Sequence, residues 1–181
     1  MLTDQINFIL AIFTLLGLAF IVLALIYLLF FQKSHNRLTN FISKNGITLA
    51  FIIALVSTLG SLYYSEIVGL IPCDLCWIQR IFMYPQVVLL GLAWWKKDDG
   101  IIPYSLALLG IGTLFAVYHN YIYYGAQPVV NFCSIVSPCV QQYVVGFGFI
   151  GIPLMSLTAF LMIGLLLICK KINHKQTLEK N

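Results

Sequence analysis

Charged residues are scarce in this chain: Lys, Arg, Asp and Glu make up 9% of its 181 residues, whereas hydrophobic residues make up 61%. An ordinary soluble domain carries about 25% charged residues, so that class is excluded. Internal repeats and low-complexity segments are also absent, which indicates one domain. The longest polar stretch, residues 125–146, is predicted to be a loop, which leaves no room for a domain outside a membrane.

Apolar runs fill most of the chain. A bilayer core of about 30 Å needs about 20 apolar residues per helix. Segments that reach or approach this length are 6–31, 47–71, 78–95, 101–124 and 147–169. The first differs from a cleaved signal peptide, because its N-terminus lacks positive charge, its apolar run is long and no small-x-small site closes it. We therefore expect an all-α integral membrane protein that retains its first helix.

The basic residues predict the orientation, because Lys and Arg accumulate in cytoplasmic connections. Nine of the ten lie after the first segment, after the third segment or in the tail: Lys33, Arg37, Lys44, Lys96, Lys97, Lys170, Lys171, Lys175 and Lys180. These parts are expected to be cytoplasmic, and the N-terminus, the break at 72–77 and the loop at 125–146 are expected outside. The net charge of +4 thus reflects topology and does not indicate nucleic acid binding.

Four of the five cysteines form two pairs, Cys73/Cys76 and Cys133/Cys139, and this orientation places both pairs outside. Disulfides persist there because cytosolic reductants do not reach them. Two cysteine pairs at one face of a membrane indicate the transfer of electron pairs between thiols and a carrier in the lipid. Cys169, near the inner end of the last segment, is expected to be a small buried hydrophobic residue.

The C-x-x-C pair lies at a predicted helix start. Pro72 is expected to stop the preceding helix, because it removes a backbone donor and clashes with the previous turn. The next helix is expected to begin within the C-x-x-C, where unpaired N–H groups and the helix dipole favour a Cys76 thiolate. Arg80 lies four residues further on and would share the face of Cys76.

Arg80 is the one basic residue outside the predicted cytoplasmic set. An arginine at this depth is costly unless it is paired or hydrated, so it is a functional candidate, and snorkelling to the headgroups is the alternative. The spacing from Cys76 favours a function. Arg80 would stabilise a Cys76 thiolate and the negative charge on a reduced cofactor.

The cysteine pattern alone leaves other sites open, because C-x-x-C also serves zinc sites and structural disulfides. Five residues separate Cys133 from Cys139, more than the two to four usual between zinc ligands, and an oxidising compartment favours disulfides. In a loop bent by Pro128 and Pro138, this pair forms either an exchangeable disulfide or a structural staple.

His119 lies near the outer end of the fourth segment, next to several tyrosines. It is either a hydrogen-bonded interfacial residue or a proton donor to a quinone oxygen, since reduction of a quinone consumes two protons. Glu66, seven residues before Cys73, has the same two interpretations: an interfacial residue or a proton donor to the quinone. The tyrosines are expected to form an aromatic belt, and some could wall a flat ring.

These residues resemble a known family. Residues 72–80 read Pro72-Cys73-Asp74-Leu75-Cys76-Trp77-Ile78-Gln79-Arg80. This segment resembles the signature P-C-x-L-C-x-x-x-R of the DsbB disulfide-bond-formation proteins. The family has a shorter branch, BdbC, which is typical of Gram-positive bacteria. This chain resembles that branch in segments 60–67, 80–85 and 148–153 and in the spacing of Cys133 and Cys139. The likeness covers residues 47–170.

The resemblance implies a four-helix transmembrane bundle in the bacterial cytoplasmic membrane, here with one extra N-terminal transmembrane helix. Residues 1–46 would hold that helix and a cytoplasmic loop, residues 47–170 the redox domain, and residues 171–181 a cytoplasmic tail. The role of the extra helix is open.

The resemblance also implies a function. The protein would reoxidise a thioredoxin-fold thiol oxidase similar to DsbA or BdbD and pass the electrons to membrane quinone, either menaquinone or ubiquinone. Cys133 and Cys139 would form the disulfide that the partner attacks, with the mixed disulfide on Cys133. Cys73 and Cys76 would reoxidise that pair, with Cys76 contacting the quinone, and Arg80 and His119 would bind the quinone.

One departure and two rivals accompany this interpretation. The close spacing of Cys133 and Cys139 leaves little room for the wide rearrangement proposed for members with a long loop. A quinone reductase of the vitamin K epoxide reductase type is disfavoured, because the C-x-x-C follows Pro72 and precedes Arg80. A non-catalytic scaffold, with structural disulfides or a zinc ion held by the four cysteines, is the other rival.

Overall fold

The computed structural model describes residues 2–30, 37–127, 133, 139 and 145–178. The long helices in this part are α1 (Leu2–Phe30), α2 (Arg37–Leu62), α3 (Asp74–Lys96), α4 (Ile102–Tyr123) and α5 (Ile152–Leu178). The short elements are the π-helical turn η1 (Tyr63–Ile67), the 3-10 turn η2 (Asp99–Ile101) and the strands β1 (Val145–Gly146) and β2 (Ile150–Gly151). Each long helix contains a segment long and apolar enough to cross a membrane.

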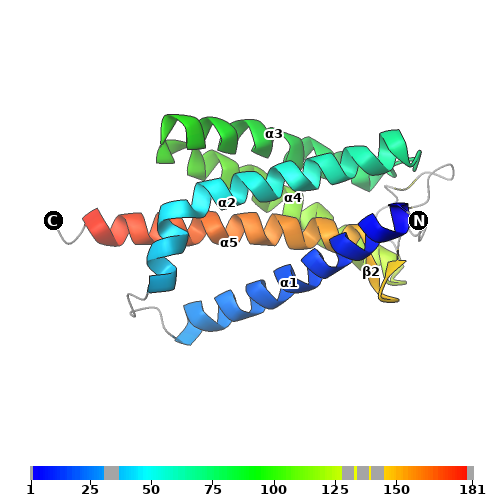
Figure 1. The fold of residues 1–181 in the computed structure, drawn as a ribbon, viewed down its shortest axis with the longest axis horizontal. Coiled ribbons are helices and arrows are strands. Elements are labelled where there is room, and N and C mark those ends of the chain that lie inside the picture. The colour runs from blue at the N-terminus through cyan, green and yellow to red at the C-terminus, as the bar shows by residue number, and fades with distance from the viewer. Residues whose placement is uncertain (1, 31–36, 128–132, 134–138, 140–144, 179–181) are drawn as a thin grey trace.

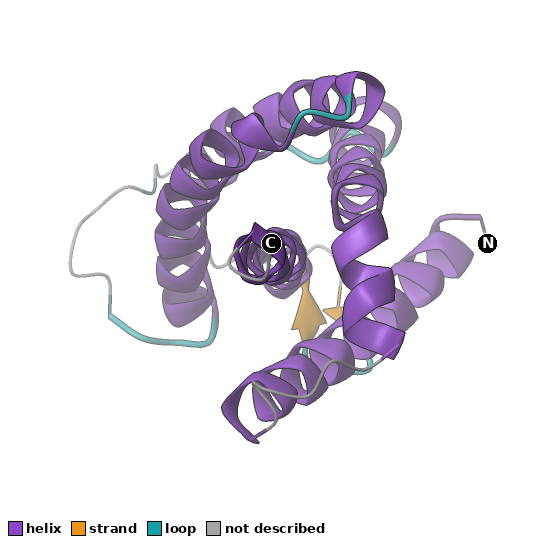
Figure 2. Cartoon of the chain, turned by 90° about the vertical axis from the view of Figure 1, so that its left-hand side faces the viewer, coloured by secondary structure: helices purple, strands orange, loops and turns teal. Residues whose placement is uncertain are grey.

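Helices α2, α3, α4 and α5 pack into one bundle, in which each helix contacts the next and α5 returns to α2. Helix α1 lies outside this bundle and crosses α5 obliquely, so that its N-terminal half lies near β1 and β2 (Figure 1). Seen from the end that holds the C-terminus, α5 runs along the line of sight with the other helices around it (Figure 2). The predicted four-helix bundle with one extra N-terminal helix is confirmed.

The strands β1 and β2 are the exception to an all-helical chain within the described residues. They pair antiparallel, and the turn between them holds Phe147 at φ 52° and Gly148 at φ 81°. A right-handed helix cannot continue through positive φ. Helix α5 therefore begins at Ile152, later than the predicted residue 147.

The break between α2 and α3 also differs from the prediction. The helical segment ends at Ile67, before Pro72, because Gly69 takes φ 76° and the N–H of Leu70 donates to the carbonyl of Tyr64 at 2.9 Å. A glycine with positive φ just past the last helical residue is a common helix stop. The prediction that Pro72 ends this helix is wrong, and Pro72 lies in the connection that leads into α3.

Helices α2 and α5 pack closely at the end away from the cysteines. Ala50 and Ala54 are fully buried there, and a Cβ atom added to Gly46 would lie 3.3 Å from the carbonyl oxygen of Leu166. Small residues of this kind let two helix backbones approach closely. Nearer the cysteines, side chains of both helices line a cavity that lies beside the thiols.

Candidate active site

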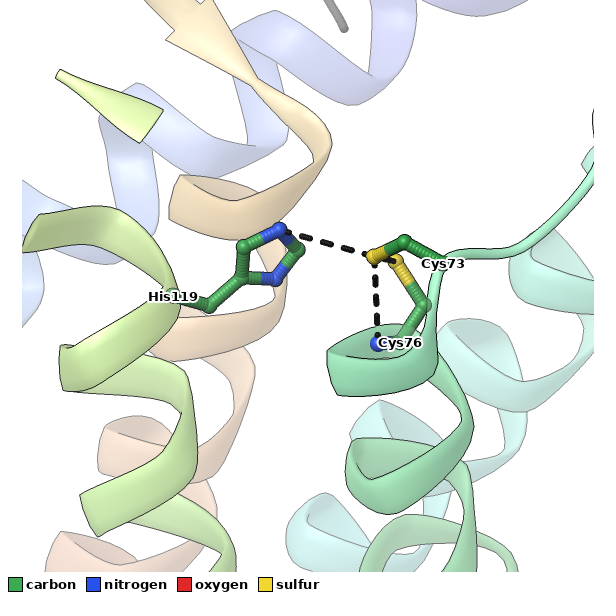
Figure 3. Close-up of side chains that lie close together, drawn as sticks. All are labelled: Cys73, Cys76 and His119. Atoms are coloured by element: carbon green, nitrogen blue, oxygen red, sulfur yellow. Dashed lines mark hydrogen bonds between the residues drawn. The ribbon is translucent and has the colours of Figure 1, made fainter. Parts of the chain in front are cut away.

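Cys73 and Cys76 meet at the start of α3. Cys73 is the N-cap residue of the helix, and its Sγ accepts a hydrogen bond from the backbone N–H of Cys76 at 3.3 Å. The two Sγ atoms lie 2.7 Å apart (Figure 3). The prediction that the helix begins within the C-x-x-C is confirmed. The sulfur that caps the helix is that of Cys73, and Cys76 lies in the first turn.

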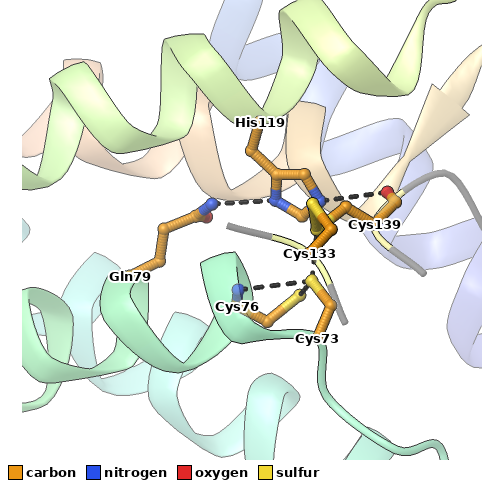
Figure 4. The surroundings of a disulfide bond; sticks show 6 residues. All are labelled: Cys73, Cys76, Gln79, His119, Cys133 and Cys139. Carbon is orange, nitrogen blue, oxygen red and sulfur yellow. Dashed lines mark hydrogen bonds between the residues drawn. A yellow bond between two sulfur atoms is a disulfide. The ribbon is translucent and has the colours of Figure 1, made fainter. Parts of the chain in front are cut away.

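Cys133 and Cys139 form a disulfide. Cys139 is buried and packs with Cys73 in one apolar cluster, which Cys76 and Cys133 join from its edge. The fold thus places both predicted pairs side by side at one end of the bundle (Figure 4). The predicted bends at Pro128 and Pro138 lie outside the described residues.

His119 on α4 lies beside both pairs and is 2% exposed. Its Nε2 lies 3.7 Å from Cys73 Sγ and 3.3 Å from the backbone carbonyl oxygen of Cys139. On the other side of the ring, Nδ1 lies 2.9 Å from Nε2 of Gln79, and Ser156 Oγ donates to Gln79 Oε1 (Figure 4). The sequence placed His119 in the right region, and the structure brings it to the thiols.

These contacts select one form of the imidazole. The Gln79 amide places its oxygen toward Ser156 and its nitrogen toward His119, so the nitrogen donates to Nδ1. An amide nitrogen only donates, which makes Nδ1 an acceptor and leaves the proton on Nε2. The Nε2–H group therefore points toward Cys73 and the Cys139 carbonyl and can donate to the sulfur.

The environment favours a thiolate on Cys73, so the prediction that the helix start favours a Cys76 thiolate is wrong. A hydrogen bond from the Cys76 thiol lowers the pKa of Cys73 below its ordinary value, with further lowering by His119 and by the backbone N–H of Cys76. Burial acts in the opposite direction, but the hydrogen bonds outweigh it. Hydrogen bonds to the charged form of a group stabilise that form, and the start of a helix adds to the effect.

Arg80 is fixed by its neighbours on α2 and α3. Its Nε donates to Ser61 Oγ at 2.9 Å, and its terminal amino group donates to the Ser61 carbonyl oxygen at 3.0 Å. Tyr84 also donates to Ser61 Oγ, at 3.3 Å, and the guanidinium carbon lies 5.2 Å from the centre of the Trp77 ring. This framework holds a positive charge within the bundle one helical turn from Cys76, as the spacing predicted.

A cavity of about 490 Å³ connects these groups. This volume lies within the range of about 300–1,000 Å³ typical of small-molecule sites. Cys73 and Cys76 contribute to its wall, together with Arg80 and His119. Apolar side chains of α1, α2 and α5 line much of the rest, and the tyrosines that line it are Tyr64, Tyr84 and Tyr123. These three tyrosines line the cavity, and the expectation that some tyrosines wall a flat ring stays a prediction.

A metal is the alternative occupant of the thiol cluster. The sulfurs of Cys73 and Cys76 and a ring nitrogen of His119 lie within 4.8 Å of one another. Two thiolates on tetrahedral zinc, with Zn–S bonds of about 2.3 Å, would lie about 3.8 Å apart. The observed separation of 2.7 Å is shorter and suits a pair that forms a disulfide. The four-thiolate zinc alternative also fails in this structure, since Cys133 and Cys139 are bonded to each other.

Two other predictions have different outcomes. Glu66 is exposed, accepts a hydrogen bond from Ser65 and does not line the cavity. Cys169 is half-buried on α5 rather than buried.

The residues that the sequence did not reveal are Gln79, Ser156 and Ser61. Gln79 directly precedes Arg80 and lies three residues after Cys76, which was a usable signal, because i and i+3 share a helix face. The two serines carry no such spacing, because they come from other helices.

Comparison with known proteins gives consistent matches. The sequence model of the family described as "Disulfide bond formation protein DsbB" matches residues 43–170. "Disulfide bond formation protein C" of Bacillus subtilis is 44% identical over 128 residues, which are 66% of this chain and 90% of the relative. The "Probable disulfide formation protein" of Oceanobacillus iheyensis is 42% identical over 67% of this chain and 85% of its own length. The "Probable disulfide formation protein" of Coxiella burnetii is 40% identical over 66% of this chain and 82% of its own length. No solved structure gives a significant match.

Proposed function

Because the chain belongs to the DsbB family of disulfide bond formation proteins, a family of helical membrane oxidoreductases, we propose that it reoxidises a thioredoxin-fold thiol oxidase and passes the electrons to a membrane quinone. The observation that carries the proposal is that both cysteine pairs pack in one cluster, and that Cys73, Cys76, Cys139, His119 and Arg80 line one largely apolar cavity.

The cysteine end of the bundle faces the outside in this proposal, and the C-terminus is cytoplasmic. The basic residues support this orientation, because nine of ten lie in the connections and the tail predicted to be cytoplasmic. The ion pair between Lys170 and Asp99, at 3.2 Å, lies at the opposite end of the bundle from the thiols. The orientation is required chemically, since the partner must reach Cys133–Cys139 where disulfides persist.

The first step is an exchange between the partner dithiol and the Cys133–Cys139 disulfide. A partner thiolate attacks one sulfur, the second partner thiol then attacks the mixed disulfide, and the partner leaves oxidised while both loop cysteines become thiols. We assign the mixed disulfide to Cys133, because Cys133 is partly exposed whereas Cys139 is 4% exposed.

The second step moves the electron pair to the C-x-x-C. A loop thiolate attacks Cys73 of the Cys73–Cys76 disulfide and releases the Cys76 sulfur. The second loop thiol then attacks the mixed disulfide, which re-forms Cys133–Cys139 and releases Cys73. A leaving sulfur with a low pKa departs faster, so the hydrogen bonds that stabilise a Cys73 thiolate favour this direction. The packing of both pairs in one cluster makes a wide rearrangement unnecessary.

The residues fit a quinone, which has a flat apolar ring and two carbonyl oxygens that accept hydrogen bonds. A bound quinone supplies the chemistry of accepting two electrons and two protons from the Cys73/Cys76 dithiol, whose disulfide is thereby restored. Arg80, held by Ser61, offers positive charge and hydrogen-bond donors within the cavity wall. His119 holds a proton on Nε2 beside Cys73. Either menaquinone or ubiquinone is compatible with these groups.

The test is anaerobic quinone absorbance with the purified protein in detergent, after addition of a reduced thioredoxin-fold oxidase. We expect the band of the oxidised quinone to disappear. Serine at Cys76 or Cys133 should abolish this loss, and serine at Cys169 is the matched control that should leave it intact. No reduction of any quinone by protein with intact disulfides would contradict the proposal and favour a structural scaffold.

A further inference from the structure

Helix α1 lies outside the family match, which covers residues 43–170, and the aligned relatives cover about two thirds of this chain. The bundle of α2 to α5 already holds both cysteine pairs, Arg80 and His119. A helix added to a complete redox bundle raises the question of what it contributes.

Helix α1 is fixed to the cysteine half of the bundle through one face. Ala11, Thr14 and Gly17 are buried on that face. A Cβ atom added to Gly17 would lie 2.7 Å from Sδ of Met162 on α5, so the glycine permits close approach of the two helices. The Tyr64 hydroxyl donates to Asn7 Oδ1 at 2.7 Å, which ties α1 to η1 as well.

This position makes α1 part of the cavity. Leu10, Phe13 and Thr14 line it, facing a wall to which α2 contributes Val56 and α5 contributes Met155. Thr14 is 6% exposed and therefore covered, whereas Phe13 is 63% exposed and lies at the rim. An exposed phenyl ring of α1, a helix long and apolar enough to cross a membrane, thus forms part of the edge of the cavity.

We propose that α1 is the membrane-side wall of the quinone cavity, and that Leu10 and Phe13 determine how tightly the protein holds its quinone. This inference rests on the proposed function. An apolar ring or prenyl chain at the rim gains contact area against Leu10 and Phe13 instead of lipid, and contacts made only in the bound state raise affinity and slow release. Thr14, further inside, limits the space available to a ring.

The experiment measures binding of a decyl-substituted benzoquinone to the oxidised full-length protein by quenching of its tryptophan fluorescence. Trp77, next to Arg80, is a reporter close to the cavity. Phe13→Ala and Leu10→Ala should each raise Kd about tenfold, the effect typical of lost apolar contacts in a pocket. Thr14→Phe should weaken binding further by filling the cavity. Exchange of Cys133–Cys139 with a small dithiol should stay unchanged in all three variants.

Leu16→Ala is the matched control. Leu16 lies on the same helix and is 61% exposed, close to the 63% of Phe13, but it does not line the cavity. Wild-type Kd values for Phe13→Ala and Leu10→Ala, in a protein that still reduces quinone, would overturn the role of α1 and leave the proposed function standing. A wild-type protein that neither binds nor reduces quinone would overturn both. Photolabelling by an azido-quinone should mark the α1 peptide, and labels confined to α2–α5 would also contradict the inference.

Discussion

The Nε2 atom of His119 lies 3.7 Å from Sγ of Cys73. The same nitrogen lies 3.3 Å from the carbonyl oxygen of Cys139, so one buried imidazole contacts both cysteine pairs. Because the Gln79 amide donates to Nδ1 of His119, the Nε2 atom of His119 carries a proton. His119 therefore acts in this arrangement as a donor to sulfur, and stabilisation of a Cys73 thiolate stabilises the reduced form of the C-x-x-C.

His119→Ala should lower the reduction potential of the Cys73/Cys76 pair. A hydrogen bond to a charged group contributes about 1.5–3 kcal/mol. For a two-electron couple about 30 mV corresponds to 1.4 kcal/mol, so the expected decrease is about 30–60 mV. His119→Gln, whose amide nitrogen can replace Nε2, should recover most of it. Equilibration with glutathione buffers, followed by mass spectrometry of alkylated peptides, measures the potential, and equal values for the alanine variant and wild type would contradict this role.

Cys73 should stay reactive at low pH. Its pKa is lowered, chiefly by the hydrogen bond from Cys76, so its thiolate persists to a lower pH than that of an ordinary thiol, whose pKa is about 8.5. The midpoint of its alkylation rate should therefore lie below that of a model thiol. Cys76→Ala removes the donor and should raise the midpoint, whereas Cys76→Ser keeps a hydroxyl donor and should raise it less. A midpoint in Cys76→Ala identical to that of wild type would show that Cys76 is not the main cause.

Much of this architecture is readable from the sequence, because length and apolarity decide which segments span a bilayer. The length and apolarity of a segment identify the part of a helix that crosses the bilayer, but they do not identify the residues at which the helix begins and ends. Helix α2 begins at Arg37 instead of residue 47, since a helix continues into polar residues that the criterion of apolarity ignores. The stop at Gly69 was missed because Pro72 is the more obvious breaker, and positive φ at a glycine is a property of the folded chain.

The candidate site was predictable where the chemistry lies within one segment. Cys73, Cys76 and Arg80 share the start of α3, so spacing alone related them. The contact of His119 with Cys73 joins α4 to α3, and the hydrogen bond between Ser156 and Gln79 joins α5 to α3. Such pairs depend on how the helices are rotated against one another, which one sequence does not specify.

Gln79 should act as a positioning residue for His119, and two substitutions separate this role from a purely structural one. Gln79→Leu removes the donor to Nδ1, so the Nε2–H form is no longer selected and the Cys73/Cys76 potential should fall. Gln79→Glu places a carboxylate at Nδ1, which favours the doubly protonated ring and a stronger donor to Cys73, so the potential should rise. Shifts in the same direction for both variants would indicate general disruption of the site.

Arg80→Ala should raise the KM for quinone by about tenfold or more, because a charge-assisted hydrogen bond is lost. Exchange of Cys133–Cys139 with a dithiol should be unaffected. Ser61→Ala should raise the KM less, since Ser61 acts by holding the guanidinium. The double variant should equal Arg80→Ala alone, because removal of a support has no effect once the supported group is absent. Additive effects would show that Ser61 contributes independently.

Two glycines on α4 provide a test of the packing that positions His119. A Cβ atom added to Gly112 would lie 2.5 Å from Cε1 of Phe160 and 3.0 Å from Cβ of Phe82, whereas one added to Gly110 meets nothing within 4 Å among the described residues. Gly112→Ala should destabilise the protein by about 1–3 kcal/mol, because overpacking forces α4 away from α3 and α5. Gly110→Ala should be neutral or stabilising by up to about 1 kcal/mol, because alanine favours the helix.

Thermal unfolding in detergent measures both effects, and the reduction potential of the Cys73/Cys76 pair provides a second readout. If α4 moves in Gly112→Ala, His119 moves with it, so the potential should shift toward that of His119→Ala. Gly110→Ala should keep the wild-type potential. A strongly destabilised Gly112→Ala with an unchanged potential would mean that the thiol cluster holds His119 locally, without help from the α4 packing.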